Sequence, residues 1–303
     1  MYNIIGKTKY TYIFSGALTI LSILSLFVWG LKYDIDFTGG TLMEVRFANT
    51  LPANQEITEM LKDLNLNSLT IQGSQSSDKA SVLIRYASED DKTNSDVWSA
   101  ISAKYPDAQQ LRADFINSTV SGELKTKSFN AIILAIFTIM AYIAWAFRKV
   151  SRPVESWKYG AGAVIALAHD IIITAGFFSL LGHFYGIEVG IPFIAALLTI
   201  LGFSVHDTIV VYDRTRENLL KGSSKTPFPE VVNKSLNETM VRSINTSLTV
   251  IITLLAIYLL GGATIKYFAL ALLVGVTFGT YSSIFVASAL LVTSYELTVA
   301  RRK

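Results

Sequence analysis

Six long apolar segments separate the polar parts of this sequence, and they constrain the fold more than any other feature. A helix needs about 20 apolar residues to cross the roughly 30 Å hydrocarbon core of a membrane. The sequence is 51% hydrophobic and only 16% charged, which is typical of an integral membrane protein. We therefore predict membrane-spanning helices at residues 11–30, 128–147, 159–182, 189–211, 244–260 and 267–293.

The first apolar segment could be mistaken for a signal peptide, because Lys7 and Lys9 precede it. Its apolar run is too long for one, and the stretch FVWGLKYD at its end offers no cleavage site between small residues. We interpret residues 11–30 as an uncleaved span.

The distribution of lysine and arginine predicts the orientation of these spans. If six spans alternate, one side of the membrane receives Lys7, Lys9, Arg148, Lys149, Arg152, Lys158, Arg214, Arg216, Lys221, Lys225, Lys234, Arg301, Arg302 and Lys303. The opposite short loops, 182–188 and 261–266, contain one lysine between them. Short cytoplasmic loops are enriched in cations, so both termini should be cytoplasmic. The cytoplasmic parts are then residues 1–10, 148–158, 212–243 and 300–303, and residues 128–299 hold the second to sixth spans.

The segment 31–127 has the pattern of a folded domain, which should lie on the opposite, periplasmic side. Alternating residues predict strands at 41–47, 68–73, 80–87 and 108–116. Helical spacing of apolar residues predicts helices at 53–65 and 92–105, the second capped by Asn94 or Ser95. The order β-α-β-β-α-β predicts an α+β, ferredoxin-like domain between the first two spans.

The stretch DIDFTGG, residues 34–40, connects the first span to this domain. Asp34 and Asp36 could form a cation-binding turn together with the glycines. We favour a tight connection instead, in which Gly39 and Gly40 permit backbone angles that other residues avoid.

His169 and Asp170 lie near the middle of the third predicted span. A charged aspartate costs about 2.5–3.5 kcal/mol at the centre of a membrane helix, so such residues usually pair with a neighbour or serve a function. We expect Asp170 to form a hydrogen bond between helices, and direct proton carriage is the alternative.

Asp207 lies near the cytoplasmic end of the fourth span, and Arg242 opens the fifth span at a similar depth. Burial favours the neutral form of a carboxyl group, whereas a nearby arginine favours its charged form. Movement of Arg242 could therefore switch a proton on and off Asp207. The alternative is a static ion pair that locks two helices together.

Four further polar residues lie in or just beyond the fourth span. His206 and Asp207 are adjacent and point about 100° apart on a helix, so we expect His206 to be packed or hydrogen-bonded rather than part of a proton relay. Beyond the span, Asp213, Arg214 and Glu217 should organise the cytoplasmic loop.

Four stretches carry a resemblance to a known family. They are YDIDFTGGTLMEVRF, AHDIIITAGFFSLLG, IPFIAALLTILGFSVHDTIVVYDRTREN and NETMVRSINTSLTVIITLLAIYLLGG. The sequence resembles, over nearly its whole length, the SecF family of the SecDF protein-export complexes in the RND superfamily.

The resemblance implies a function. A SecF subunit joins SecD in a complex of the bacterial inner membrane, which uses the proton gradient to promote preprotein export after the SecYEG channel and the SecA ATPase begin transfer. YajC and YidC are further implied partners. The family also implies functional roles at Asp207 and Arg242, whereas His206 stands where the family usually has asparagine. No cofactor or metal is expected.

Other functions are weighed against this one. The stretch GKT at 6–8 lacks the glycine and the preceding strand of a phosphate-binding loop, so ATP is not expected as the fuel. Without cysteine or a nucleophile beside a base, the pattern does not favour an enzyme. A self-contained exporter of a small molecule or lipid, and a passive scaffold with buried ion pairs, remain as alternatives.

Overall fold

The computed structural model describes residues 2–48, 52–76, 79–88, 90–148, 154–221 and 226–300. Lys149, Arg152, Lys225, Arg301, Arg302 and Lys303 therefore lie outside the described residues. Six helices within that part are long and apolar enough to cross a membrane, which confirms the predicted number of spans. They are Ile5–Val28, Ser118–Ala146, Ser156–Tyr185, Ile191–Lys221, Phe228–Leu260 and Ile265–Ala300.

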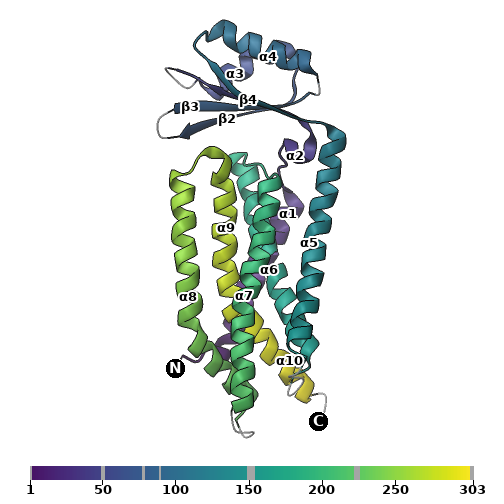
Figure 1. Ribbon diagram of the computed structural model, residues 1–303, viewed down its shortest axis with the longest axis vertical. Helices are drawn as coiled ribbons and strands as arrows, with labels where there is room; N and C mark the ends of the chain where they lie inside the picture. Colours follow the sequence, from purple (N-terminus) through teal and green to yellow (C-terminus); the bar gives the residue numbers. More distant parts are fainter. Residues whose placement is uncertain are drawn as a thin grey trace.

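These spans correspond to the helical elements of Figure 1. The first is η1 (Ile5–Lys7) followed by α1 (Thr8–Val28), and the next four are α5 (Ser118–Ala146), α6 (Ser156–Tyr185), α7 (Ile191–Lys221) and α8 (Phe228–Leu260). The last span is divided into α9 (Ala263–Ser282), the π-helical turn η3 (Ser283–Ala287) and α10 (Ser288–Ala300). Short π-helical turns in α-helices are frequent at functional sites.

Three helices extend ten residues or more beyond one end of their predicted spans. Helix α5 begins at Ser118 instead of residue 128, α7 continues to Lys221 instead of residue 211, and α8 begins at Phe228 instead of residue 244. Apolar segments end at the first charged residues, but a helix can continue through polar flanks where ion pairs join successive turns. Lys127 and Glu123 form such a pair in α5, with Nζ and Oε1 2.7 Å apart. Most of the predicted loop 212–243 is therefore helical.

The six spans divide into inner and outer helices. At least half of the residues in the most apolar stretches of α6, α7 and the last span are buried. In α1, α5 and α8 that fraction is at most 17%. The two aspartates predicted within spans, Asp170 on α6 and Asp207 on α7, thus both lie on inner helices.

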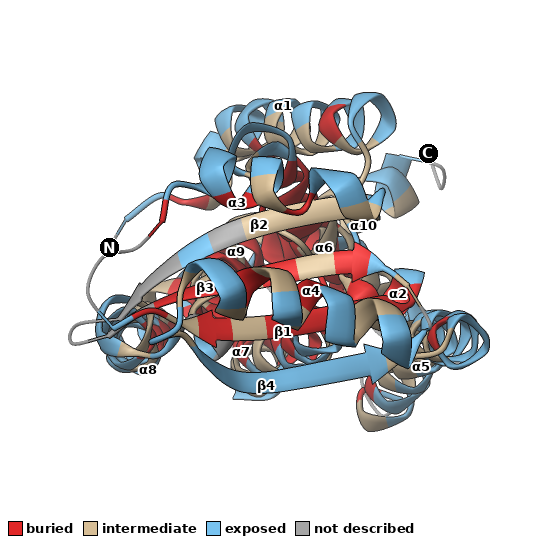
Figure 2. Cartoon of the chain, turned by 90° about the horizontal axis from the view of Figure 1, so that it is seen from above, coloured by how far each residue is buried: buried red, intermediate tan, exposed pale blue. Residues whose placement is uncertain are grey.

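The small domain holds a four-stranded antiparallel sheet. Its strands β1 (Gly40–Arg46), β2 (Asn67–Ser76), β3 (Lys79–Ala87) and β4 (Gln109–Ile116) lie in the order β2-β3-β1-β4. Helices α3 (Asn54–Met60) and α4 (Asp91–Lys104) cover one face. Figure 2 shows buried residues concentrated on β1 and β3, while the edge strand β4 is almost entirely exposed. The central strands therefore supply most of the sheet's contribution to the core.

Both helices of this domain differ in detail from the prediction. The predicted helix 53–65 ends at Met60 and continues as the 3-10 turn η2 (Lys62–Leu64), which ends at Asn65 in the left-handed conformation. Asp90 caps α4 by accepting a hydrogen bond from the Lys92 amide at 3.1 Å, so Asn94 and Ser95 are not the cap. The domain core joins the sheet to both helices and contains Met43, Val45, Ile57, Leu61, Val82, Ile84, Val97 and Ile101.

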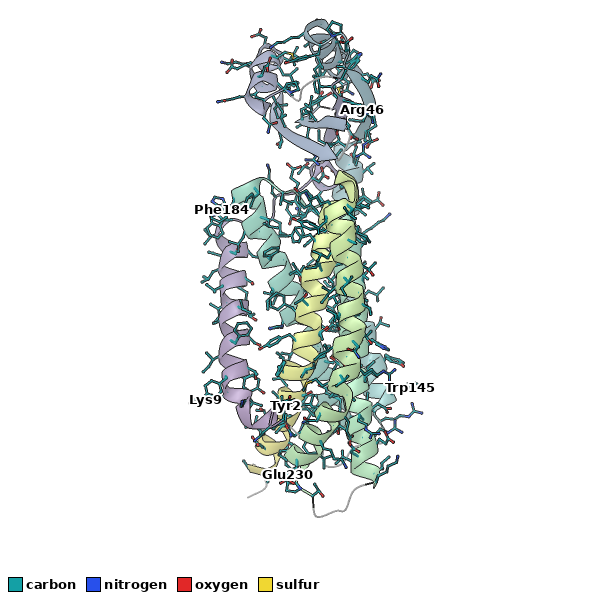
Figure 3. All side chains as sticks on the ribbon, turned by 90° about the vertical axis from the view of Figure 1, so that its left-hand side faces the viewer. Tyr2, Lys9, Arg46, Trp145, Phe184 and Glu230 are labelled. Carbon is teal, nitrogen blue, oxygen red and sulfur yellow. The ribbon has the colours of Figure 1, made fainter. Side chains whose placement is uncertain are left out.

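The small domain lies over one end of the helix bundle, and both chain termini lie at the other end (Figure 1). In Figure 3, Arg46 marks the domain and Phe184 the nearer end of the bundle, whereas Tyr2 and Glu230 lie at the far end. The short helix α2 (Ile35–Thr38), which the sequence did not predict, connects α1 to β1.

Candidate functional site

Asp207 lies on the inner helix α7, and its side chain is 3% exposed. Its Oδ2 atom is buried and has no hydrogen-bond partner among the described residues. Ser243 of α8 faces the carboxyl group, but its hydroxyl lacks the geometry of a hydrogen bond and is also unpaired within that part of the chain. A buried carboxyl oxygen without a donor is costly, so this position is not explained by stability.

Arg242 precedes Ser243 on α8 and is exposed on the outside of this single chain. No ion pair joins Arg242 to Asp207 among the described residues, although its charge acts on that carboxyl group. Adjacent helical residues point about 100° apart, and Ser243 occupies the inward direction. The static ion pair considered from the sequence is therefore absent from this conformation.

His206 also differs from its predicted environment. The sequence favours a packed or hydrogen-bonded ring, but the structure leaves His206 exposed on the surface of α7. Ser204 and Thr208, which are both buried, mark the inward side of this helix turn, and His206 lies on the opposite side. His206 and Arg242 thus both reach the outer surface near the helices that hold Asp207.

Asp170 lies on α6 and is completely buried. Its Oδ2 accepts hydrogen bonds from Ser204 of α7 and Ser282 at the end of α9, each at 2.7 Å. Its Oδ1 lies 2.9 Å from Nδ1 of His169. Asp170 therefore connects three inner helices, and each of its oxygens has a polar partner.

A group of hydroxyl side chains continues from Asp170 towards the level of Asp207. Ser283 donates to the Ser204 carbonyl at 3.0 Å, and its hydroxyl lies 2.9 Å from that of Thr208. The sequence analysis did not single out these residues. The available signal was the spacing of Ser204 and Thr208, which places two hydroxyls on one face of an apolar helix.

The polar residues beyond the span form a compact network between α7 and α8. Arg214 contacts Glu217 of its own helix at 2.5 Å and Glu238 of α8 at 2.6 Å. Asp213 instead pairs with Arg216, with Oδ1 and Nη1 3.5 Å apart. These groups connect the two helical extensions, and their exposure limits the free energy they contribute to about 0–1 kcal/mol per pair.

Asp34 and Asp36, at the junction with the small domain, have different partners. Asp34 caps α2 through the Ile35 amide at 2.7 Å and pairs with Arg85 of β3 at 3.1 Å. Asp36 accepts from the Ile191 amide at 2.7 Å and so binds the first turn of α7. Burial raises the pKa of Asp36, and the Ile191 amide opposes this. The two carboxyl groups therefore bind different partners and do not face a common site.

The glycines after these aspartates adopt backbone angles that disfavour other residues. Gly39 has a φ of 74° and Gly40 a φ of 120°. A Cβ atom on Gly40 would lie 2.5 Å from the Tyr86 carbonyl oxygen, so the close approach of β1 and β3 also requires glycine there.

A cavity of about 620 Å³ separates the sheet from the nearest ends of the bundle helices. Charged residues of the domain line one side of it, and aromatic residues of the membrane helices line the other. The former include Asp34, Arg85, Arg112 and Asp114, and the latter include Phe178, Phe193, Tyr258 and Phe268.

Comparison with known proteins places this arrangement in a family. Residues 97–297 match the family described as protein export membrane protein SecD/SecF, C-terminal, and residues 25–50 match the SecD/SecF GG motif. The protein translocase subunit SecF of Thermobaculum terrenum is 41% identical over 290 residues, covering 93% of this chain and 90% of that protein. SecF of Vibrio alginolyticus is 38% identical, covering 93% and 86%.

Solved structures agree with these matches. The crystal structure of SecDF from Thermus thermophilus has a TM-score of 0.84 and 33% identity, covering 96% of this chain and 38% of that one. A second SecDF structure, in a super-membrane-facing form, has a TM-score of 0.70 and 33% identity, with coverages of 99% and 40%. The chain therefore belongs to the SecD/SecF family of protein export membrane proteins, as one of its SecF subunits.

Proposed function

We propose that this chain uses the proton gradient, through Asp207, to promote preprotein export across the bacterial inner membrane after SecA-driven translocation. The observation that carries the proposal is the buried Oδ2 of Asp207, which has no donor among the described residues. A carboxyl group with a buried, unpaired oxygen can take up a proton there without first breaking a hydrogen bond. Asp207 is therefore suited to repeated loading and release.

Arg242 is the proposed control of that proton. A cation close to a carboxyl group favours its charged form, and the effect weakens as the two separate. Arg242 is near enough to act on Asp207 but is not paired with it, and it lies on the helix that faces α7. A relative movement of α7 and α8 would therefore change how firmly Asp207 holds its proton.

We propose SecD as the partner that completes this site. The chain spans 38% of the matched SecDF chain, so a second membrane half is expected beside it. The exposed His206 and Arg242 support contact with that half, because charged side chains at membrane depth rarely face lipid. SecYEG, SecA, YajC and YidC are the further proposed partners. The relatives named as translocase subunits do not favour a self-contained exporter.

The proposed topology places the small, ferredoxin-like domain in the periplasm and both termini in the cytoplasm. Its support is the distribution of cations together with the position of the domain opposite the chain termini (Figure 1). The domain would then lie where preprotein leaves the channel, connected to α7 through Asp36.

The test replaces Asp207 with asparagine, which has nearly the same shape but cannot ionise. Inner-membrane vesicles containing each variant at equal abundance are assayed for preprotein release with and without a proton gradient. We expect Asp207→Asn to abolish the part of release that depends on the gradient, and Arg242→Met to do much the same. Asp207→Glu keeps an ionisable group and should retain partial function.

Asp213→Asn is the matched control, because it removes an exposed carboxylate from the same helix. It should leave gradient-dependent release unchanged. Normal release by Asp207→Asn, with normal dependence on the gradient, would show that Asp207 is not the proton carrier.

A further inference from the structure

His169 and Asp170 form a buried pair that the proposed role of Asp207 does not use. The carboxyl group is completely buried, and the imidazole is 5% exposed. Nδ1 of the ring lies 2.9 Å from Oδ1 of the carboxyl group, while Oδ2 accepts from Ser204 and Ser282. The other ring nitrogen, Nε2, is buried and has no hydrogen-bond partner among the described residues.

From this geometry we propose that His169 and Asp170 are a second proton-binding site, in which one exchangeable proton is shared between the imidazole and the carboxyl group. The site lies on α6 and is distinct from Asp207 on α7. Its existence does not depend on the proposed role in export.

The number of protons that the pair can hold, and the charge that results, support a shared exchangeable proton. The contact between Nδ1 and Oδ1 requires one hydrogen between them, because two bare acceptors would repel each other at 2.9 Å. If this is the only hydrogen of the pair, Asp170 is ionised, the ring is neutral and the pair carries one negative charge. An unpaired charge in a buried site costs several kcal/mol. One additional proton makes the pair neutral.

Wherever the additional proton lies between the two groups, Nε2 of the ring carries a hydrogen. If Asp170 holds a proton and donates it to Nδ1, the neutral ring must carry its own hydrogen on Nε2. If the ring is an imidazolium, Nε2 again carries hydrogen. Because Oδ2 accepts from both serines, we place the additional proton between the ring and Oδ1 rather than on Oδ2, and Nε2 is then bare only when the pair has lost that proton. The protonation of Nε2 therefore reports directly whether the site is occupied.

The helices around the pair offer few other charges that could neutralise it. Tyr281 of α9 stacks on the His169 ring with centroids 6.3 Å apart, and its hydroxyl lies 3.0 Å from that of Ser15 on α1. On α7, Asp207 follows Ser204 by three residues, and His206 is exposed. Among the charged groups of the described residues, His169 is the one that contacts Asp170. The compensating proton must therefore reside in the pair itself.

The pair is also close to the path of α7. Ser204 donates to Asp170, and the backbone carbonyl of Ser204 accepts from Ser283, whose hydroxyl lies beside Thr208. Thr208 follows Asp207 directly. Gain or loss of a proton by the pair therefore acts on the helix turn that holds Asp207. Ser283 is also the first residue of η3.

The protonation of His169 can be measured directly, because the chain contains only three histidines. The full chain is labelled with ¹⁵N-histidine, placed in lipid bilayers and studied by solid-state NMR between about pH 5 and pH 10, on both sides of the ordinary range of histidine. His183→Gln and His206→Asn assign the remaining resonances to His169. No proton gradient is needed, so failure here is distinguishable from failure of the proposed export function.

We expect Nε2 of His169 to carry a proton at low pH and to lose it in one transition, while Nδ1 remains hydrogen-bonded. Asp170→Asn should displace that transition by roughly one to three pH units, which is the usual influence of a charge in direct contact. Ser282→Ala is a milder second variant, because it removes one donor to Oδ2, and it should also displace the transition.

Asp213→Asn is the control and should leave the transition in place, because its carboxylate is exposed beyond the span. The proposal is overturned if Nε2 keeps one protonation state over the whole range. It is equally overturned if a transition is seen that neither Asp170→Asn nor Ser282→Ala displaces.

Discussion

Asp170 and Asp207 are both buried aspartates within membrane-spanning helices, but their surroundings differ. Asp170 has a hydrogen-bond partner at each oxygen, provided by His169, Ser204 and Ser282. Asp207 has an oxygen without a partner in the described part of the chain, and Arg242, whose charge acts on it, is exposed. The two residues carry the same chemical group into the same kind of environment.

The difference shows two ways in which a membrane helix can hold a carboxyl group. Donors from neighbouring helices offset the cost of burial at Asp170, so removing that carboxyl group leaves several polar groups unpaired. The cost remains at Asp207, which is consistent with a group retained for function rather than stability. Substitutions at each carboxyl group and at its neighbours separate these two situations.

The largest difference should come from truncating each aspartate to alanine. Asp170→Ala leaves His169 and Ser204 without this acceptor and Ser282 with only the Gly279 carbonyl, and we expect a loss of about 3 kcal/mol in the free energy of unfolding. Asp207→Ala removes a group without a described donor at Oδ2 and should cost less than about 1 kcal/mol. Equilibrium unfolding in mixed detergent micelles measures both. Equal losses would remove the distinction between the two sites.

The serines beside the two carboxyl groups sharpen the comparison. Ser282→Ala removes a 2.7 Å hydrogen bond to Asp170 and should lower the free energy of unfolding by about 1.5–3 kcal/mol if the carboxyl group is charged, or by about 1 kcal/mol if it is neutral. Ser243→Ala is the matched variant beside Asp207. Its hydroxyl is buried without a described hydrogen bond, so its removal should leave stability unchanged within about 0.5 kcal/mol.

The same unfolding measurements decide the outcome. A destabilised Ser243→Ala variant would mean that Asp207 is held by this hydroxyl after all. A Ser282→Ala variant with unchanged stability would mean that the burial of Asp170 does not depend on its hydrogen-bond donors.

Asp36 extends the comparison to a half-buried carboxyl group outside the spans and should show the smallest effect. Burial raises its pKa, so the folded protein keeps this proton at pH values where the unfolded chain has lost it. The contribution of Asp36 to stability therefore falls as pH rises from about 3.9, the ordinary pKa of aspartate, through the raised pKa. Asp36→Asn cannot ionise and still offers an oxygen to the Ile191 amide.

We expect the stability of Asp36→Asn relative to the parent protein to rise over that pH interval and then level off. Unfolding of both proteins at a series of pH values measures this difference, and Asp107→Asn, an exposed aspartate of the same domain, is the control. A difference that is constant with pH would contradict a raised pKa at Asp36.

Local patterns in the sequence predicted much of this molecule. Apolar runs located all six spans, and alternation placed each strand of the small domain to within a few residues. The helix ends were predicted less well. Asp90 rather than Asn94 or Ser95 caps α4, and α7 and α8 extend well beyond their apolar segments. Hydropathy reports where a helix meets lipid, whereas caps and ion pairs decide where it ends.

The residues of the candidate sites were predictable from the sequence, but their contacts were not. Asp170 and Asp207 were identifiable because a carboxyl group in an apolar run is expensive in any fold. The hydrogen bonds that distinguish them join residues far apart in the chain: Asp170 to Ser204 over 34 positions and to Ser282 over 112. Asp36 reaches Ile191 over 155 positions. Contacts between residues so far apart in the chain cannot be predicted from the residue pattern of any single helix or strand.

The amino-acid pattern alone is enough to predict six membrane-spanning helices, a small α+β domain after the first of them, and two aspartates inside the bundle. These properties depend on burial and on local backbone geometry, which act over neighbouring residues. The folded structure was needed to show that Asp170 has its donors, that Asp207 lacks a described one at Oδ2, and that His206 and Arg242 are exposed. Those properties depend on how each helix is rotated against its neighbours, and packing of the whole bundle sets that rotation.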